Sequence, residues 1–185
     1  MCGRYSLYVD EDPEIARIVA QIGRDIETGE IYPTNTAPVL VGKAAGLLAP
    51  AAMTWGFPQY NRKGVLINAR SETAAEKRTF REALSSRRCV VPTTGFFEWD
   101  SQKHKRRFNL PGSSALYLGG LYNEDESGGR FVILTTAANP SVINVHDRMP
   151  LVLPEDQLAA WVHDRAWAMR LLHKVPPPLL HQPAS

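Results

Sequence analysis

Cys2 carries the most distinctive chemistry of this chain, because it directly follows the initiator methionine. Initiator methionine is normally removed when the second residue is small, and removal would leave Cys2 with a free α-amine beside its thiol. Such an aminothiol can condense with an aldehyde to a Schiff base, and the thiol can then add to the imine carbon and close a thiazolidine ring. Reference pKa values of about 7.7–8.0 for the amine and about 8.5 for the thiol leave both groups partly deprotonated near neutral pH.

The surroundings of Cys2 in the sequence bear on its reactivity. The thiolate is the stronger nucleophile, and the positive charge of Arg4 would increase its population. The alternative is that Cys2 is an ordinary small residue at a frayed chain end. Residues 3–9 alternate weakly, and a strand there would fix Cys2 in space.

Two further segments set polar groups in restricted or apolar surroundings. Asn35 lies in a loop bounded by Pro33 and Pro38. Glu98 is set among aromatic residues, and on a strand it would share one face with Phe96. A carboxyl group on an apolar face has a raised pKa, which suits it to proton transfer. A structural ion pair between Glu98 and an arginine is the alternative.

His146 and the segment 68–73 are two more polar positions between apolar stretches of the sequence. Histidine is the natural acid or base near neutral pH, although a lone histidine is also a common structural hydrogen-bonding residue. The segment 68–73 contains asparagine, arginine, serine and threonine, which are all types that contact phosphate. Ser71 or Thr73 could instead cap a following helix, and the two interpretations are compatible.

Charge and composition exclude several classes of function. The net charge of +2 is too small to indicate nucleic-acid binding by itself. The basic run from Lys103 to Arg107 lies between two strand candidates, and we interpret it as a solvated hairpin tip. No Walker motif, Rossmann glycine fingerprint or zinc-ligand spacing is present, so we expect no metal ion and no nucleotide cofactor.

The length of 185 residues suits a single domain over 1–185, with a core of about 2–165 and an extended proline-rich tail over 174–185. Two cysteines, Cys2 and Cys89, do not make a disulfide framework. No apolar run has membrane-spanning length, and the first residues lack the pattern of a secretory signal. We therefore expect a reducing, cytoplasmic location without membrane contact.

The periodicity of apolar residues predicts an α+β fold. Isoleucine and valine recur at helical spacing after Pro13, which predicts a helix over 13–23. The β-rich second half predicts a largely antiparallel, barrel-like β core flanked by short helices. The other expected elements are strands over 38–42, 47–54, 65–69, 88–92, 95–100, 106–110, 115–122 and 130–136, a loop over 57–64, and helices over 73–85 and 154–163.

Taken in order, these segments resemble the SOS response-associated peptidase (SRAP) family, whose members crosslink to abasic sites in single-stranded DNA. Each short motif alone is weak, whereas the ordered set over most of the chain is specific. The matching segments are 1–5, 35–38, 55–56, 68–73, 88–92, 95–99, 135–139 and 146–150.

The resemblance implies a role for each of four residues. Cys2 would be the crosslinking residue, acting through its amine and its thiol. Asn35 would hold the amine and the developing ring. Glu98 would help to protonate the oxygen of the sugar ring and so open it to the aldehyde, and His146 would move protons during Schiff-base formation and reversal.

The resemblance also implies a set of DNA-binding residues and a binding partner. The partner would be single-stranded DNA that contains an abasic site, and the protein would bind it as a monomer. A lesion in single-stranded DNA need not be extruded from a duplex stack. Members of the family often carry tryptophans after the Trp-Gly pair, where this chain offers Phe57 and Tyr60 as residues on which bases could stack. The expected DNA contacts are Arg4, Asn68 and Arg70 to phosphate, with Ser71, Phe57, Tyr60 and Pro38 beside them.

Two other functions remain open at this point. Class II glutamine amidotransferases also begin Met-Cys-Gly and use the cysteine as a nucleophile on an amide, but that interpretation leaves 95–99 and 146–148 unexplained. A non-covalent single-stranded-DNA-binding module would use Arg4, Arg70 and the aromatic residues. Such a module predicts that the Cys2→Ala variant keeps its full function.

Overall fold

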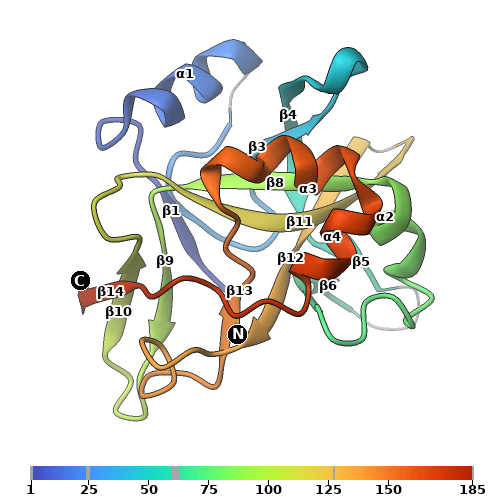
Figure 1. Cartoon of the computed structure of the whole chain (residues 1–185). Helices are drawn as coiled ribbons and strands as arrows, with labels where there is room; N and C mark the ends of the chain where they lie inside the picture. The colour runs from blue at the N-terminus through green and yellow to red at the C-terminus, as the bar shows by residue number, and fades with distance from the viewer. Residues whose placement is uncertain (1, 24–25, 60–62, 127, 185) are drawn as a thin grey trace.

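A closed β-barrel forms the centre of the computed structural model, which describes residues 2–23, 26–59, 63–126 and 128–184 (Figure 1). Five strands follow one another in the order β11-β8-β3-β4-β12, and β12 pairs back with β11 to close the ring. All of these pairs are antiparallel except that of β12 with β4. This confirms the expected α+β fold with a barrel-like core. The barrel strands are β3 (Thr36–Gly42), β4 (Leu48–Trp55), β8 (Arg88–Thr93), β11 (Leu116–Asp125) and β12 (Gly128–Ala137).

A second, fully antiparallel sheet carries the two ends of the described chain. Its strand order is β14-β10-β9-β1-β2, so the strand that follows Cys2 lies inside the sheet and the last strand lies at an edge. The tail over 174–185, expected to be extended, therefore contains an edge strand. The strands are β1 (Tyr5–Leu7), β2 (Gly29–Ile31), β9 (Gly95–Trp99), β10 (Lys105–Asn109) and β14 (Leu180–Pro183).

Four short strands complete the sheets. The single strand expected over 65–69 is two strands, because its two halves pair with different partners. β6 (Val65–Leu66) pairs with β5 (Phe57–Pro58), inside the expected loop, and β7 (Asn68–Arg70) runs parallel to β12. β13 (Arg148–Pro150) pairs with the far end of β12.

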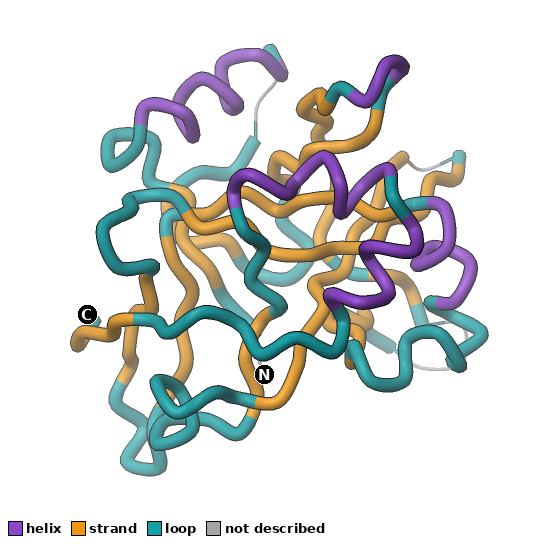
Figure 2. The backbone as a smooth tube through the Cα atoms, viewed as in Figure 1, coloured by secondary structure: helices purple, strands orange, loops and turns teal. Residues whose placement is uncertain are grey.

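The helices lie outside the barrel, with α3 and α4 on one face in Figure 2. The helix expected after Pro13 is confirmed: Oδ1 of Asp12 accepts hydrogen bonds from the N–H groups of Glu14 and Ile15, at 2.9 and 3.0 Å, and the helix ends at Gly23 with a φ of 61°. The helices are α1 (Pro13–Ile22), α2 (Arg81–Ser86), α3 (Leu158–His163) and α4 (Arg165–Leu171), with short 3₁₀ turns η1 (Ala44–Gly46) and η2 (Glu155–Gln157).

The helix expected over 73–85 is wrong over most of its length. Residues 71–79 form successive turns, and a regular helix begins only at Arg81. Between residues 72 and 79 only Ala74 is buried, so this stretch has no continuous apolar face that packing could stabilise as a helix.

Arg88 joins two helices to the barrel. It is 3% exposed, and its guanidinium donates hydrogen bonds of 2.7–2.8 Å to four backbone carbonyls. Two of these belong to Leu84 and Ser85 in α2, and two to Trp161 and Val162 in α3. The buried charge is therefore held at the carboxyl ends of two helices, where a cation is favoured.

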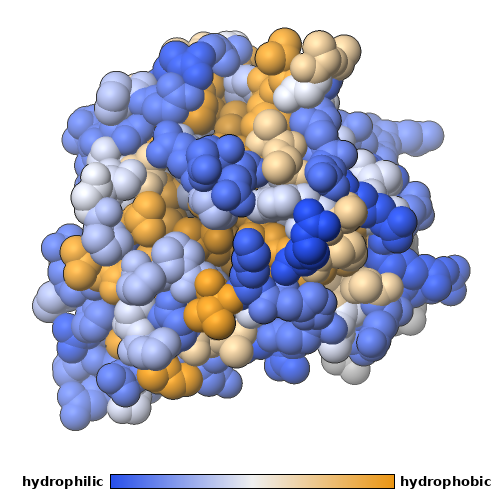
Figure 3. All heavy atoms as spheres, viewed as in Figure 1, coloured by the Kyte–Doolittle hydropathy of each residue, from blue (hydrophilic) through white to orange (hydrophobic). Residues whose placement is uncertain are grey.

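The surface mixes hydrophilic atoms with smaller apolar patches on the face shown in Figure 3. Large exposed apolar side chains include Val175 and Leu180, both in the C-terminal segment. Among the helices of the described residues, none is long and apolar enough to cross a membrane.

Candidate functional site

Cys2 is fixed in the interior. Its side chain is completely buried, its carbonyl oxygen accepts a 2.9 Å hydrogen bond from Nδ2 of Asn68, and its thiol lies 3.7 Å from the carbonyl oxygen of Arg4. Burial raises the pKa of the Cys2 thiol, and the nearby carboxylate of Glu98 raises it further. This corrects the expectation that Arg4 promotes the thiolate, because in the folded chain the surroundings favour the neutral thiol.

Asn68 is held beside Cys2 by the short strand β7. Its register partner in the parallel strand β12 is Ile133, and the ring nitrogen of Trp55 donates to the carbonyl oxygen of the preceding residue, Ile67, at 3.0 Å. Oδ1 of Asn68 is buried and has no hydrogen-bond partner among the residues that the structure describes. One acceptor next to Cys2 is thus unused by the described protein groups.

Glu98 and His146 form a second pair at the site. Glu98 is 4% exposed on β9, and its Oε2 lies 4.0 Å from Nε2 of His146. Burial raises the pKa of Glu98, while His146 acts in the opposite direction and Asp147 adds to the rise. The pair therefore combines an imidazole with a carboxyl group that retains its proton to higher pH than a free glutamic acid does.

The contacts of His146 determine which nitrogen carries its proton. The backbone N–H of Arg148 donates a 3.0 Å hydrogen bond to Nδ1 of His146. Nδ1 is therefore the acceptor in the neutral ring, and the proton is on Nε2, the nitrogen that faces Glu98. Nδ1 also lies 3.0 Å from Oδ1 of Asp147, a contact that is favourable when the ring is doubly protonated. Each protonation state of His146 thus has its own partner at Nδ1.

Arg4 is already engaged within the protein. Its Nη1 lies 3.2 Å from Oε2 of Glu30, and its guanidinium lies 4.2 Å from the ring centre of Tyr32 and 5.0 Å from that of Trp99. Glu30 also pairs with Lys105. The phosphate contact of Arg4 stays a prediction, and it would compete with this ion pair.

The basic run over 103–107 is also paired. Lys105, Arg106 and Arg107 form part of strand β10 and contact Glu30, Asp100 and Glu11, respectively. The interpretation of the whole run as a solvated hairpin tip is therefore wrong, and the exposed tip is limited to the residues before β10.

Arg70 and Ser71 lie at the end of β7 with opposite exposure. Arg70 is exposed and makes no ion pair with the residues that the structure describes, so it is available to a phosphate. Ser71 is 2% exposed, and its N–H donates to the carbonyl oxygen of Thr135 at 2.8 Å. A DNA contact by the Ser71 side chain would require this buried group to become accessible.

A pairing that the sequence analysis did not anticipate joins two of its motifs. Nη1 and Nη2 of Arg148 lie 2.6 and 2.8 Å from the two carboxylate oxygens of Glu72, and Nη2 also donates to the carbonyl oxygen of Thr135 at 2.7 Å. Charged residues in two separate motifs were the only signal available, and they carry no information about pairing.

Three of the residues expected at the site make contacts within the fold, and their predicted roles stay predictions. Oδ1 of Asn35 accepts a 2.7 Å hydrogen bond from the N–H of Tyr32, so it closes a turn, and the recorded contact with Cys2 is made by Asn68. Pro38 is buried in β3. Phe57 is 2% exposed and packs against Phe80 with ring centres 6.2 Å apart, so its ring is not presented to a base.

Tyr60, the other residue expected to stack on bases, lies outside the described residues. Among the residues that the structure does describe, no cluster of three or more histidine, cysteine, aspartate or glutamate side chains is arranged to hold a metal ion.

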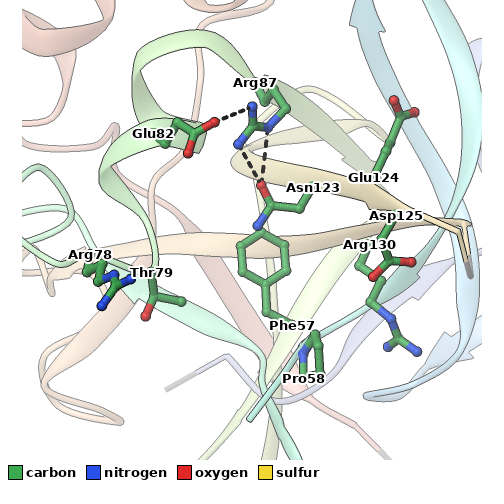
Figure 4. Close-up of a pocket in the computed structure, with 10 residues that line it drawn as sticks. All are labelled: Phe57, Pro58, Arg78, Thr79, Glu82, Arg87, Asn123, Glu124, Asp125 and Arg130. Carbon is green, nitrogen blue, oxygen red and sulfur yellow. Dashed lines mark hydrogen bonds and ion pairs between the residues drawn. The ribbon is translucent and has the colours of Figure 1, made fainter. Parts of the chain in front are cut away.

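A cavity of about 900 Å³ opens at the other end of β12 (Figure 4). Arg130 lines this cavity near the start of β12, whereas Arg70 pairs with Thr135 further along the same strand. At roughly 3.3 Å per residue, Arg130 and Thr135 lie about 16 Å apart along β12. Arg87 pairs there with Glu82 at 3.0 Å and donates twice to Oδ1 of Asn123. The charges of the lining balance, since it contains three arginines and three carboxylates: Arg78, Arg87 and Arg130, and Glu82, Glu124 and Asp125. The cavity is thus separate from the cluster around Cys2.

Comparisons with known proteins agree with this architecture. Residues 1–182 match the family model described as SOS response associated peptidase (SRAP). The abasic site processing protein YoqW of Bacillus subtilis is 30% identical over 89% of this chain and 81% of its own length. YedK of Escherichia coli, also an abasic site processing protein, is 30% identical over 88% of this chain and 79% of its own length. An X-ray structure of a protein from Bordetella bronchiseptica superimposes with a TM-score of 0.81 at 22% identity, covering both chains completely, which shows the same fold.

Proposed function

The chain belongs to the SOS response-associated peptidase (SRAP) family, and from this premise we propose that it captures abasic sites in single-stranded DNA through a covalent bond to Cys2. Several of its relatives are named abasic site processing proteins, which supports DNA with such a lesion as the substrate. The observation that carries the proposal is the convergence of three elements at Cys2, with Asn68 on its main chain and the Glu98–His146 pair beside it.

The proposed reaction uses each group once. A protonated Glu98 donates to the ring oxygen of the sugar as the bond from that oxygen to C1′ breaks, and the hydroxyl on C1′ gives its proton to solvent water as the aldehyde forms. The raised pKa of Glu98 supports this role, because it keeps a larger share of the carboxyl protonated near neutral pH.

Capture of the aldehyde then requires Met1 to be absent. The amine nitrogen of Cys2 bonds to C1′ and the aldehyde oxygen leaves as water, with His146 moving the protons. The thiol sulfur bonds to the same carbon while its proton passes to the nitrogen, which closes the thiazolidine. A thiol that stays neutral until this step fits the raised pKa of Cys2. Ring closure removes the Schiff base, which otherwise permits β-elimination and strand cleavage.

Asn68 is better placed than Asn35 to hold the amine. Its Nδ2 already fixes the carbonyl group of Cys2, and its Oδ1 is a buried acceptor without a partner among the described residues. We therefore assign to Asn68 the positioning role that the sequence analysis gave to Asn35, and Arg70 keeps the phosphate contact.

The test is the intact mass of the purified protein, before and after incubation with single-stranded DNA that carries one abasic site. We expect a starting mass without methionine, followed by a heat-stable adduct with the mass of protein plus DNA minus one water. The Cys2→Ala variant should bind this DNA and form no stable adduct, whereas Cys2→Ser keeps the amine and should cleave the strand without a durable bond. A processed protein that forms no adduct would overturn the proposal in favour of amide hydrolysis or plain DNA binding.

A further inference from the structure

Asn139 lies two residues after the end of the barrel strand β12, at the start of the loop that carries His146. It is 5% exposed, and its carbonyl oxygen accepts 3.0 Å hydrogen bonds from the N–H groups of Val142 and Ile143. The next turn of the loop is closed by the N–H of His146, which donates to the carbonyl oxygen of Val142 at 3.0 Å. Two successive backbone-hydrogen-bonded turns thus connect Asn139 to His146.

The side chain of Asn139 binds the C-terminal segment. Its Nδ2 donates to the carbonyl oxygens of Pro176 and Pro177, at 3.0 and 2.9 Å. Its Oδ1 accepts from both the backbone nitrogen and the hydroxyl group of Ser141, at 3.0 and 2.5 Å. That hydroxyl oxygen accepts in turn from the N–H of Leu179 at 2.9 Å. All four side-chain hydrogen-bonding positions of the amide are occupied.

The same segment is bound at its other end to the sheet that carries Glu98. Strand β14 pairs with β10, and β10 pairs with β9, so that Pro183, Arg106 and Glu98 lie in one row across three strands. The ring of His181 also packs against Phe108 of β10, with centres 5.2 Å apart. In Figure 1 the red segment runs across the front of the molecule from α4 to β14.

We propose that residues 176–183 form a strap that holds His146 at its distance from Glu98, and that Asn139 is the positioning residue to which the strap is pinned. One end of the strap is tied to the His146 loop and the other to the Glu98 sheet, and the two side chains lie 4.0 Å apart between them. The consequence for catalysis rests on the proposed function, whereas the effect on the loop does not.

The sharpest variant is Asn139→Asp. The carboxylate keeps both acceptor contacts with Ser141 but cannot donate to the two proline carbonyls, so it removes the direct contacts of residue 139 with the strap and leaves that of Ser141 with Leu179. Ser141→Ala is a milder variant, since it removes one contact to Asn139 and the acceptor for Leu179. The matched control is Val175→Ala, which changes the residue just before the strap, and this residue is 77% exposed.

The first measurement is amide hydrogen exchange of the full-length protein, which is independent of activity. Asn139→Asp should accelerate exchange at the amides of Val142, Ile143, Val145 and His146, with a smaller effect in Ser141→Ala and none in Val175→Ala. The barrel amides of β8 should keep their protection in all three. Unchanged exchange in the loop of Asn139→Asp would overturn the strap.

The second measurement is single-turnover capture of an abasic site at saturating DNA, over a range of pH. Asn139→Asp should lower the rate constant by about ten-fold or more and alter its pH profile, because a placed proton-transfer group contributes on the order of 10²–10⁴-fold. The dissociation constant for intact single-stranded DNA should stay within about two-fold, which separates positioning from general damage. A mobile loop with an unchanged rate constant would overturn the positioning role, and a wild-type protein that captures nothing would overturn the proposed function instead.

Discussion

Oε2 of Glu98 lies 4.0 Å from Nε2 of His146, the ring nitrogen that carries the proton when the imidazole is neutral. The carboxyl group is on a strand of the second sheet and the imidazole is on the loop between two strands of the other. Burial raises the pKa of Glu98, so its carboxyl group keeps its proton to a higher pH than a free glutamic acid does. The pair thus places a proton-donating carboxyl group beside an imidazole, and a reaction with alternate protonation and deprotonation needs two such groups.

Glu98→Gln should slow the capture of abasic sites, because the amide cannot deliver a proton to the ring oxygen of the sugar. We expect a loss on the order of a hundred-fold on ordinary, ring-closed abasic sites. The loss should be much smaller on an analogue that already presents an open aldehyde. Single-turnover rates on both substrates provide the measurement, and equal slowing on the two would exclude a ring-opening role.

Glu98 should also make the free energy of unfolding depend on pH. Its pKa in the folded protein is raised above the usual 4.5, so between these two values the folded state binds more protons than the unfolded state. The wild-type protein therefore loses stability as pH rises through this interval. The Glu98→Gln variant has no titrating group at this position and does not lose this stability. The free energy of unfolding of the variant, minus that of the wild type, should therefore be larger at pH 7 than at pH 4. Urea unfolding at both pH values measures this, with the exposed Glu76→Gln as control. A pH-independent difference would contradict the prediction.

Arg70→Ala should weaken binding to single-stranded DNA and lower the slope of log K against log salt by about one unit. The reason is that Arg70 is exposed and makes no ion pair among the described residues. Arg17→Ala is the matched control, since Arg17 is an exposed arginine paired with Glu14 on α1. Binding isotherms at several salt concentrations test this, and identical slopes for the two variants would leave Arg70 without a phosphate contact.

Arg88→Met should destabilise the fold by about 3 kcal/mol, because it leaves four carbonyls at the ends of α2 and α3 without their charged donor. The exposed Arg81→Met, at the start of α2, should change stability by less than about 0.5 kcal/mol. Urea denaturation of both variants gives the comparison. Equal, small effects would mean that methionine packing compensates for the lost hydrogen bonds.

Elements with their own periodic pattern could be predicted from the sequence. The isoleucines after Pro13 and the β-rich run from Arg88 onward predict α1 and the later strands close to their observed bounds. The short strands β2, β13 and β14 were not anticipated, nor was helix α4. All four residues of β14 are exposed, so its conformation depends on hydrogen bonds to β10 and not on an apolar pattern of its own.

The same limit applies to the site. Cysteine, glutamate and histidine could be singled out because their chemistry is unusual in their settings, and the roles given to them stay predictions. Which asparagine accompanies Cys2 could not be determined, because Asn35 and Asn68 both lie in polar stretches. Only the parallel pairing of β7 with β12 brings Asn68 to the carbonyl group of Cys2, and such a pairing joins segments far apart in the chain.

The position of β1 inside its sheet has a consequence for the order of events during synthesis. Tyr5 pairs on one side with Ile31 and on the other with Phe96, so the first strand stays incompletely paired until about ninety further residues have left the ribosome. At about 5–20 residues per second this interval lasts roughly 5–20 s. In the finished fold Cys2 is completely buried. An enzyme that cuts the peptide bond before Cys2 therefore has its best access to the nascent chain, before β1 is paired on both sides.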